Sequence, residues 1–259
     1  MKRKILLCKA SFKKEIIFFK RYLFNSLGRF LTLYLYFLLM FAGYKGLTGS
    51  SAKYGGVLEG LVVGYTLWIL TTSVYEEVAY TILTEAREGT LEQLYMSIHG
   101  FGWVMGMKML AKIIIEIFFV SVVLFVLMLT TNKYLNLDVT SLAIIIFFTL
   151  LSVLGIGFIF GGLALIFKQI SSYLQIVTFG FIGLIAAPVS QIPNIEYLPT
   201  TWGSSLIYDV MVSGKSIMEF TFNEVGLLAA VGFVYLFLGY GIYKLCERIA
   251  MNKGLLGHY

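Results

Sequence analysis

Long apolar segments recur along this chain and constrain its fold more than any other feature. A helix needs about 20 mainly apolar residues to cross the hydrocarbon core of a bilayer. Of the 259 residues, 59% are hydrophobic and only 13% are charged, whereas soluble globular domains contain about 25% charged residues. This composition excludes a soluble enzyme, a disulfide-stabilised secreted scaffold and a disordered tail protein. It predicts an all-α, polytopic membrane protein.

The apolar segments divide the chain into an N-terminal amphipathic helix, residues 1–29, and a transmembrane domain, residues 30–259. Six spans are predicted in this domain, at about 30–48, 55–75, 109–130, 141–167, 173–190 and 222–245. Six spans use roughly 120 residues, which leaves no room for a separate soluble catalytic domain of about 100–150 residues. We therefore expect a protein that is not an enzyme.

Residues 1–29 form a basic segment whose apolar residues recur at helical spacing. Phe12, Ile16, Phe19 and Leu23 fall on one helical face, and the lysines and arginines lie off it. A helix of this kind lies in the membrane interface. The alternative is an amphipathic helix packed on a soluble core. The interface is favoured because the chain has no such core.

The distribution of basic residues predicts the orientation of the spans. With six spans and a cytosolic N-terminus, sixteen of the 20 Lys and Arg residues fall on the cytosolic side, and the other four are Lys45, Lys53, Lys133 and Lys215. We expect a multi-pass protein of the cell (inner or plasma) membrane with both termini in the cytosol. Topology and contact with membrane lipids then explain the net charge of +6, and no nucleic-acid partner is expected.

Cysteine and histidine are too few and too scattered for metal or redox chemistry. The chain has two of each, Cys8, Cys246, His99 and His258. A zinc site needs three or four clustered ligands, and a disulfide framework needs several spaced cysteines. We expect no metal site and no bound cofactor in this chain.

The longest polar stretch inside the chain, residues 76–100, carries five carboxylates. It predicts a helix, a break at Gly89 and a second short helix that starts at Thr90. With both termini in the cytosol, this segment lies on the cytosolic side. One interpretation is a surface helix that lies on the bilayer. The other is a docking element for a cytosolic partner.

Part of this stretch resembles a known family. The residues Glu85-x-Arg87-Glu88-Gly89-Thr90-Leu91-Glu92-x-Leu94 follow the second predicted span by a few positions. This motif is similar to the cytosolic motif of ABC type-2 exporter permeases, and its wording is closer to the drug- and peptide-exporting branch. The family layout of an interface helix, six spans, a coupling helix between spans two and three and a re-entrant outer segment between spans five and six fits nearly the whole chain. One departure is Ser97-Ile98-His99, where that branch often has a small residue and a proline.

The resemblance implies the permease subunit of an ATP-driven exporter. Its cargo would be amphipathic: a drug, a peptide or a lipid. A separate cytosolic ABC ATPase subunit would bind ATP and Mg²⁺, and a second permease copy or a homologous permease would complete a dimer. The eight named residues of the motif would couple the ATPase to the spans. The alternative function is a stand-alone channel or a secondary carrier, which predicts ion-coupling residues deep in several spans.

Four ionisable residues fall inside or at the ends of predicted spans, where charged groups are costly and often functional. Glu116 lies about two turns into the third span, and Lys112 and Lys108 precede it at four-residue steps on one face. A Lys112–Glu116 pair is the simpler interpretation, and a transport role is the other. Glu59 and Glu224 lie near the outer ends of their spans. They line an outer vestibule or face lipid headgroups.

Two further features bear on packing. All three prolines, Pro188, Pro193 and Pro199, precede or fall in the outer segment 191–221, which keeps apolar residues throughout. It forms either a re-entrant turn with a short interfacial helix or an ordinary outer loop. Gly157 and Gly161 are four residues apart in the fourth span and permit close helix approach, within one chain or between two.

Overall fold

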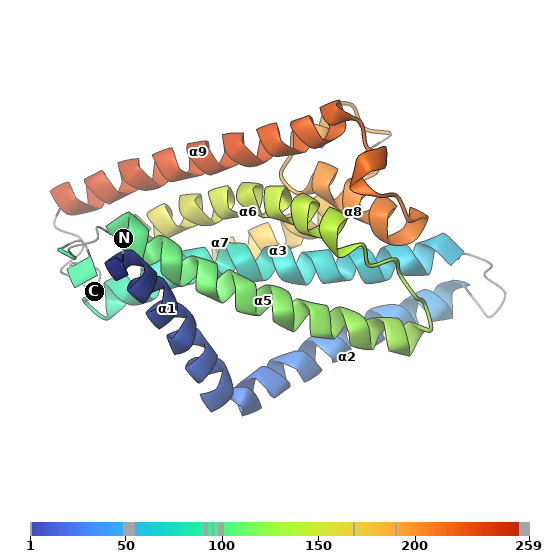
Figure 1. Ribbon diagram of the computed structural model, residues 1–259, viewed down its shortest axis with the longest axis horizontal. Coiled ribbons are helices and arrows are strands. Elements are labelled where there is room, and N and C mark those ends of the chain that lie inside the picture. Colours follow the sequence, from blue (N-terminus) through green and yellow to red (C-terminus); the bar gives the residue numbers. More distant parts are fainter. Residues whose placement is uncertain are drawn as a thin grey trace.

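The computed structural model describes residues 2–48, 55–90, 93–94, 96–97, 101–167, 169–189 and 191–253, and every regular element in these ranges is a helix. The long helices run roughly side by side along the longest axis of the molecule (Figure 1). In chain order the elements are α1 (Lys2–Arg21), α2 (Leu23–Thr48), α3 (Gly55–Arg87), α5 (Phe101–Thr131), α6 (Val139–Phe167), α7 (Ser171–Ala186), the 3₁₀ turn η1 (Ile195–Tyr197), α8 (Thr201–Ser213), the 3₁₀ turn η2 (Ile217–Glu219) and α9 (Phe222–Asn252).

Five of the described helices, α2, α3, α5, α6 and α9, are long and apolar enough to cross a membrane. The all-α prediction and the multi-pass prediction are therefore confirmed at this level. The fifth predicted span, 173–190, corresponds to α7, which has only 16 residues. Sixteen residues rise about 24 Å, less than the roughly 30 Å of a hydrocarbon core. The helix ends at Ala186 because Ala187 is extended and precedes Pro188.

The boundary between the N-terminal helix and the first span was predicted too late. α1 ends at Arg21, and α2 begins at Leu23 after a single turn residue, Tyr22, instead of at residue 30. Helical hydrogen bonds continue through the bend, from Tyr22 N to Phe18 O (2.9 Å) and from Ser26 N to Tyr22 O (3.0 Å). The bend contains no proline or glycine that could mark it in the sequence. Arg29 consequently lies inside the first long apolar helix.

α1 leaves α2 at a steep angle and packs against α5 (Figure 1). Its predicted apolar face is only partly the packed one. Phe12 and Phe19 are half-buried, whereas Ile16 and Leu23 are about half exposed. Phe18 also stays exposed. The helix therefore keeps apolar surface on the side that faces away from the bundle.

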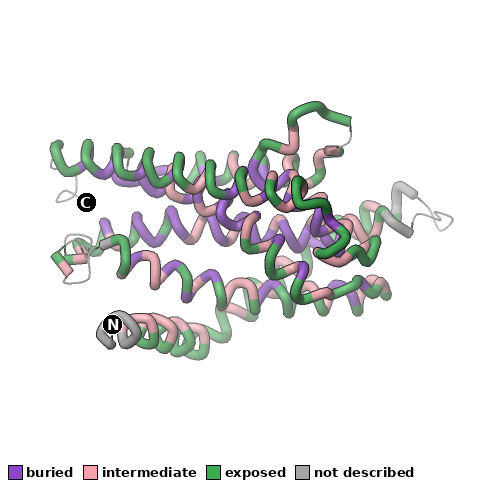
Figure 2. The backbone as a smooth tube through the Cα atoms, turned by 45° about the horizontal axis from the view of Figure 1, so that its top comes forward, coloured by how far each residue is buried: buried purple, intermediate pink, exposed green. Residues whose placement is uncertain are grey.

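α3 forms the centre of the bundle and packs against α5, α6, α7 and α8. Figure 2 shows the buried residues concentrated along the central helices. One face of α3 meets α6 through glycines: a Cβ on Gly157 would lie 2.8 Å from the Val78 side chain, and one on Gly161 would lie 2.4 Å from Ile82. The glycine spacing therefore serves packing within one chain.

α6 and α9 approach each other closely through glycines. A Cβ built on Gly155 would lie 2.1 Å from the Tyr235 carbonyl oxygen, and one on Gly239 would lie 2.0 Å from the Gly155 carbonyl oxygen. Only glycine permits two backbones to approach this closely.

The outer segment 191–221 folds into η1, α8 and η2. α8 packs against α3 and α6 with Leu206, Ile207 and Val210 buried, and Gly203 sits directly against Thr149. α8 lies at the end of the bundle opposite the N-terminus of α1 (Figure 1). The predicted short helix is present, and the re-entrant placement stays a prediction.

Candidate functional site

A polar face runs along the C-terminal half of α3. The second predicted span ended at residue 75, but the helix continues without interruption to Arg87 and carries the polar residues on one side. Spacings of three and four residues place them on a common face. α5 presents three ionisable residues at four-residue steps opposite this face. Together these residues form what we call the polar column: Ser73, Glu76, Glu77, Tyr80, Thr81 and Glu85 of α3, Lys108, Lys112 and Glu116 of α5, and Arg29 of α2.

Two ion pairs join α3 to α5 in the column. Lys108 Nζ lies 2.5 Å from Glu85 Oε1, and Lys112 Nζ pairs with Glu77 Oε1. The predicted Lys112–Glu116 pair was therefore wrong. Both residues lie on the face of α5 that looks toward neighbouring helices, so each finds a partner there instead of on its own helix.

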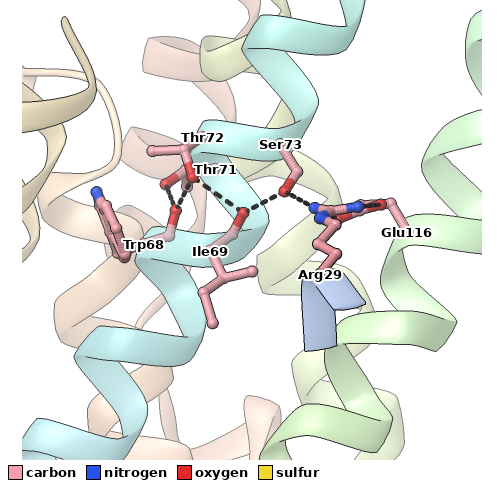
Figure 3. A network of polar contacts seen from close by, with 7 residues as sticks. All are labelled: Arg29, Trp68, Ile69, Thr71, Thr72, Ser73 and Glu116. Carbon is pink, nitrogen blue, oxygen red and sulfur yellow. Dashed lines mark hydrogen bonds and ion pairs between the residues drawn. The ribbon is translucent and has the colours of Figure 1, made fainter. Parts of the chain in front are cut away.

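The partner of Glu116 is Arg29, which reaches across from α2 (Figure 3). Arg29 Nη1 donates to Glu116 Oε2 at 3.0 Å and Nη2 donates to Oε1 at 2.5 Å, a bidentate arrangement. Nη2 also donates to Ser73 Oγ at 2.7 Å. The guanidinium carbon lies 4.8 Å from the ring centre of Phe119. One side chain thereby connects α2, α3 and α5.

A cavity of about 350 Å³ opens beside this contact, between α2, α3, α5 and α7. We call it the Glu76 cavity, because Glu76 projects from its α3 wall without an ion pair to any described residue. Thr178 of α7 donates to Glu76 Oε1 at 3.1 Å. Trp68 also lines the cavity, and its Nε1 donates to the Thr178 carbonyl oxygen at 3.1 Å.

The predicted break at Gly89 is confirmed. Gly89 has φ +68°, the left-handed conformation that glycine adopts at helix ends. Gly89 N donates to Ala86 O (3.2 Å) and Thr90 N donates to Glu85 O (3.1 Å), the two bonds of a Schellman motif. The Thr90 hydroxyl donates to Glu85 Oε2 at 2.5 Å. Glu85 therefore joins Thr90 on one carboxylate oxygen and Lys108 on the other.

The remaining residues of the predicted coupling motif are placed in part. Leu94 N donates to Thr90 O at 3.0 Å, which is a helical bond, and Leu94 is half-buried against Ile82 and its neighbours. Arg87 and Glu88 are exposed at the end of the column, and Glu88 borders a second cavity of about 330 Å³ shared with α1. Leu91 and Glu92 lie outside the described residues, so the coupling helix itself stays a prediction.

Glu59 and Glu224 lie at the opposite end of the bundle. Glu59 Oε1 accepts from Lys133 Nζ at 3.1 Å, which links the start of α3 to the loop that follows α5. Glu224 Oε2 accepts from Thr221 N at 2.7 Å and completes a capping box at the start of α9. The structure does not bring either residue to the polar column. Glu224 has a structural role that explains its position.

Sequence reasoning missed Arg29, Glu76 and Glu77 as site residues. A signal was present, because Ser73, Glu77, Thr81 and Glu85 recur at four-residue steps and extend the helical period of the second span. This signal was overlooked because the same polar residues end the apolar run at residue 75.

Among the described residues, no group of three or more His, Cys, Asp or Glu residues could hold a metal ion. Comparison with protein-family models gives no match, and comparison with curated proteins gives none either.

Proposed function

We propose that this chain is the membrane-spanning permease subunit of an ATP-driven ABC exporter. It moves an amphipathic drug, peptide or lipid out of the cell, with ATP and Mg²⁺ bound by a separate ATPase subunit. The resemblance of residues 85–94 to the coupling motif of ABC type-2 permeases is the starting point. The structural observation that carries the proposal is the carboxylate of Glu85, which ties the first residue after the Gly89 break to both α3 and α5.

This contact gives the segment after the break a direct mechanical connection to the spans. A displacement of Thr90 acts on Glu85 and, through Lys108, on α5. The Lys112–Glu77 and Arg29–Glu116 pairs continue the connection along α5 to α2. ATP binding would pull the ATPase subunits together, and the segment would transmit that motion to alternate access across the membrane.

The proposed arrangement has six spans, with α7 as a short one, and both termini in the cytosol of the cell membrane. The polar column then opens to the cytosol, and η1, α8 and η2 lie on the outer side. α1 rests in the cytosolic interface, where its exposed Ile16 and Phe18 contact lipid. A second permease copy completes the pathway, as the family resemblance implies.

One observation favours the second candidate, a stand-alone channel or secondary carrier. That function needs ionisable residues deep in several spans, and three carboxylates, Glu76, Glu77 and Glu116, line the Glu76 cavity. Two of them are already paired with Arg29 and Lys112, which favours a structural role for those two. Transport by purified protein in liposomes without any ATPase would support this candidate.

The test of the proposed function is capture of an ATPase. A P-loop ATPase encoded next to this chain should co-purify with it from detergent extract. Glu88→Lys reverses an exposed charge at the Gly89 break and should weaken capture at least tenfold. The matched control Glu196→Lys makes the same change in η1, at the opposite end of the bundle, and should leave capture unchanged. Equal capture by both variants, or none by the wild-type chain, would contradict the proposal.

A further inference from the structure

The Glu76 cavity carries an unbalanced charge. Five charged side chains line it, two positive (Arg29 and Lys112) and three negative (Glu76, Glu77 and Glu116). The two cations are paired with Glu116 and Glu77. Glu76 is the carboxylate left over, and the positive charge of Arg29 acts on it without a direct ion pair between them.

Hydrogen bonds satisfy only one side of this carboxylate. Tyr75 and Thr178 offer one hydroxyl proton each. The Tyr75 hydroxyl is closest to the Leu174 carbonyl oxygen and lies 3.5 Å from Glu76 Oε1. Thr178 is the nearer donor, at 3.1 Å, and its one proton is shared between Glu76 and the Leu174 carbonyl oxygen, which is also 3.1 Å away. From the described residues, Glu76 Oε2 receives no hydrogen bond. An uncompensated carboxylate within an apolar helix is costly, and a cationic ligand would remove that cost.

Aromatic side chains stand on both sides of Glu76 along α3. Trp68, Thr72, Glu76 and Tyr80 follow one another at four-residue steps and all line the cavity. Tyr80 is one turn from Glu76 and Trp68 is two turns away, rises of about 6 and 12 Å. The bond to the Thr178 carbonyl and the Tyr65 ring, 5.6 Å away, hold the Trp68 indole in place. Aromatic faces near a carboxylate attract organic cations by cation–π interaction.

We propose that the Glu76 cavity binds an organic monocation, with its ammonium group at Glu76 Oε2 and its apolar body against Trp68 and Tyr80. The cavity volume of about 350 Å³ lies within the roughly 300–1,000 Å³ of small-molecule sites. An anion is disfavoured by the excess of carboxylates. A bare metal cation is disfavoured because the described residues present no cluster of ligands for one. As a statement about exported cargo, this inference rests on the proposed function; as a statement about binding, it does not.

The test is fluorescence anisotropy of ethidium, an aromatic monocation, titrated with the purified full-length protein in detergent. Saturable binding is expected, and fluorescein, an anion of similar size, should show none. Glu76→Gln keeps the shape of the side chain and should weaken ethidium binding at least tenfold. Glu196→Gln removes a carboxylate from η1 and should bind as the wild type does.

Unchanged ethidium affinity in Glu76→Gln, or equally tight binding of fluorescein, would overturn the proposal. If Glu76→Gln fails to elute as a folded species, Tyr80→Leu serves instead, because this side chain is 41% exposed and its loss leaves the bundle core intact. It should weaken ethidium binding severalfold, and unchanged affinity would count against the proposal. The titration needs no ATPase, so ethidium binding without ATPase capture would refute the proposed function alone, and capture without ethidium binding would refute only this inference.

Discussion

The Thr90 hydroxyl donates to Glu85 Oε2 at 2.5 Å across the end of α3, while Glu85 Oε1 accepts from Lys108 at the same distance. The side chains of Glu85 and Lys108 are only 14% and 19% exposed, so this is a largely buried contact. A single carboxylate therefore fixes the end of one long helix, the start of the next segment and the position of α5.

Glu85→Gln should destabilise the protein by about 1–3 kcal/mol, because Lys108 loses its ionic partner in a partly buried position. A lower midpoint of thermal unfolding in detergent would show this. Lys215→Met breaks the exposed Lys215–Asp209 pair at the other end of the bundle and should leave the midpoint unchanged. Equal midpoints for Glu85→Gln and the wild type would mean that the contact is not maintained in solution.

Gly89→Val should reduce transport that depends on ATP while the protein still folds. A β-branched residue is strained at φ +68°, by about 1–2 kcal/mol, so the segment after the break would leave its position beside Glu85. The matched control is Gly214→Val, which imposes the same strain at φ +74° at the end of α8. The measurement is ATP-driven uptake into inverted vesicles that contain the co-purified ATPase. Similar losses in both variants would show a general defect and refute a specific coupling role for Gly89.

Arg29 and Glu116 should be coupled energetically, and Lys112 and Glu116 should not. A double-mutant cycle of Arg29→Gln and Glu116→Gln is expected to give an interaction energy between about 0.5 and 3 kcal/mol. The cycle of Lys112→Gln and Glu116→Gln should be additive within about 0.5 kcal/mol, since these residues bind different partners. The reverse result would restore the pairing predicted from the four-residue spacing alone.

Gly239→Ala should destabilise the bundle by about 1–3 kcal/mol, because the added Cβ would lie 2.0 Å from the Gly155 carbonyl oxygen. Gly241→Ala lies two residues along the same helix, and its Cβ would meet nothing within 4 Å. That control should be neutral or slightly stabilising. Chemical unfolding of both variants in one detergent separates the effect of the crossing from the effect of helix propensity.

Asp138 should make stability depend on pH below about 4. Hydrogen bonds from the Ser141 hydroxyl and from the backbone of Ser141 and Thr140 lower the pKa of its carboxyl below the ordinary value of 3.8. Because the pKa is lowered in the folded state, the carboxylate stabilises the fold at pH values above the pKa of the unfolded chain. This contribution disappears as the pH falls through the pKa of the folded state. Thermal midpoints between pH 6 and pH 3 should fall more steeply for the wild type than for Asp138→Asn. Parallel curves would contradict this role.

The sequence was sufficient for features that depend on local pattern. Apolar length predicted the long helices, and the isolated Gly89 in a charged stretch predicted the end of α3. Both follow from the chemistry of neighbouring residues, which needs no tertiary context. The predicted second span was too short because the charged Glu76 and Glu77 end the run of apolar residues. The helix nevertheless continues through both residues.

Contacts between helices were beyond the reach of local pattern. Lys112 and Glu116 have ideal spacing for a pair on one helix, but their partners are set by which faces of α2 and α3 look toward α5. The bend at Tyr22 moved Arg29 into α2, and neither proline nor glycine marks it. The cavity depends on the placement of α7, which its mainly apolar sequence of 16 residues does not specify.

The crossing of Gly155 and Gly239 also limits how this bundle can move. With no side chain between the two backbones, α6 and α9 have little freedom to slide or roll, because either motion would push a carbonyl oxygen into the backbone of the neighbouring helix. They act as a rigid pair. α2, by contrast, is mostly exposed. It meets α3 and α5 through the Arg29 contact, the packing of Phe37 on Tyr65 and a few further hydrogen bonds. In any large conformational change, we therefore expect α1, α2 and α5 to move relative to α6 and α9, which stay fixed to each other.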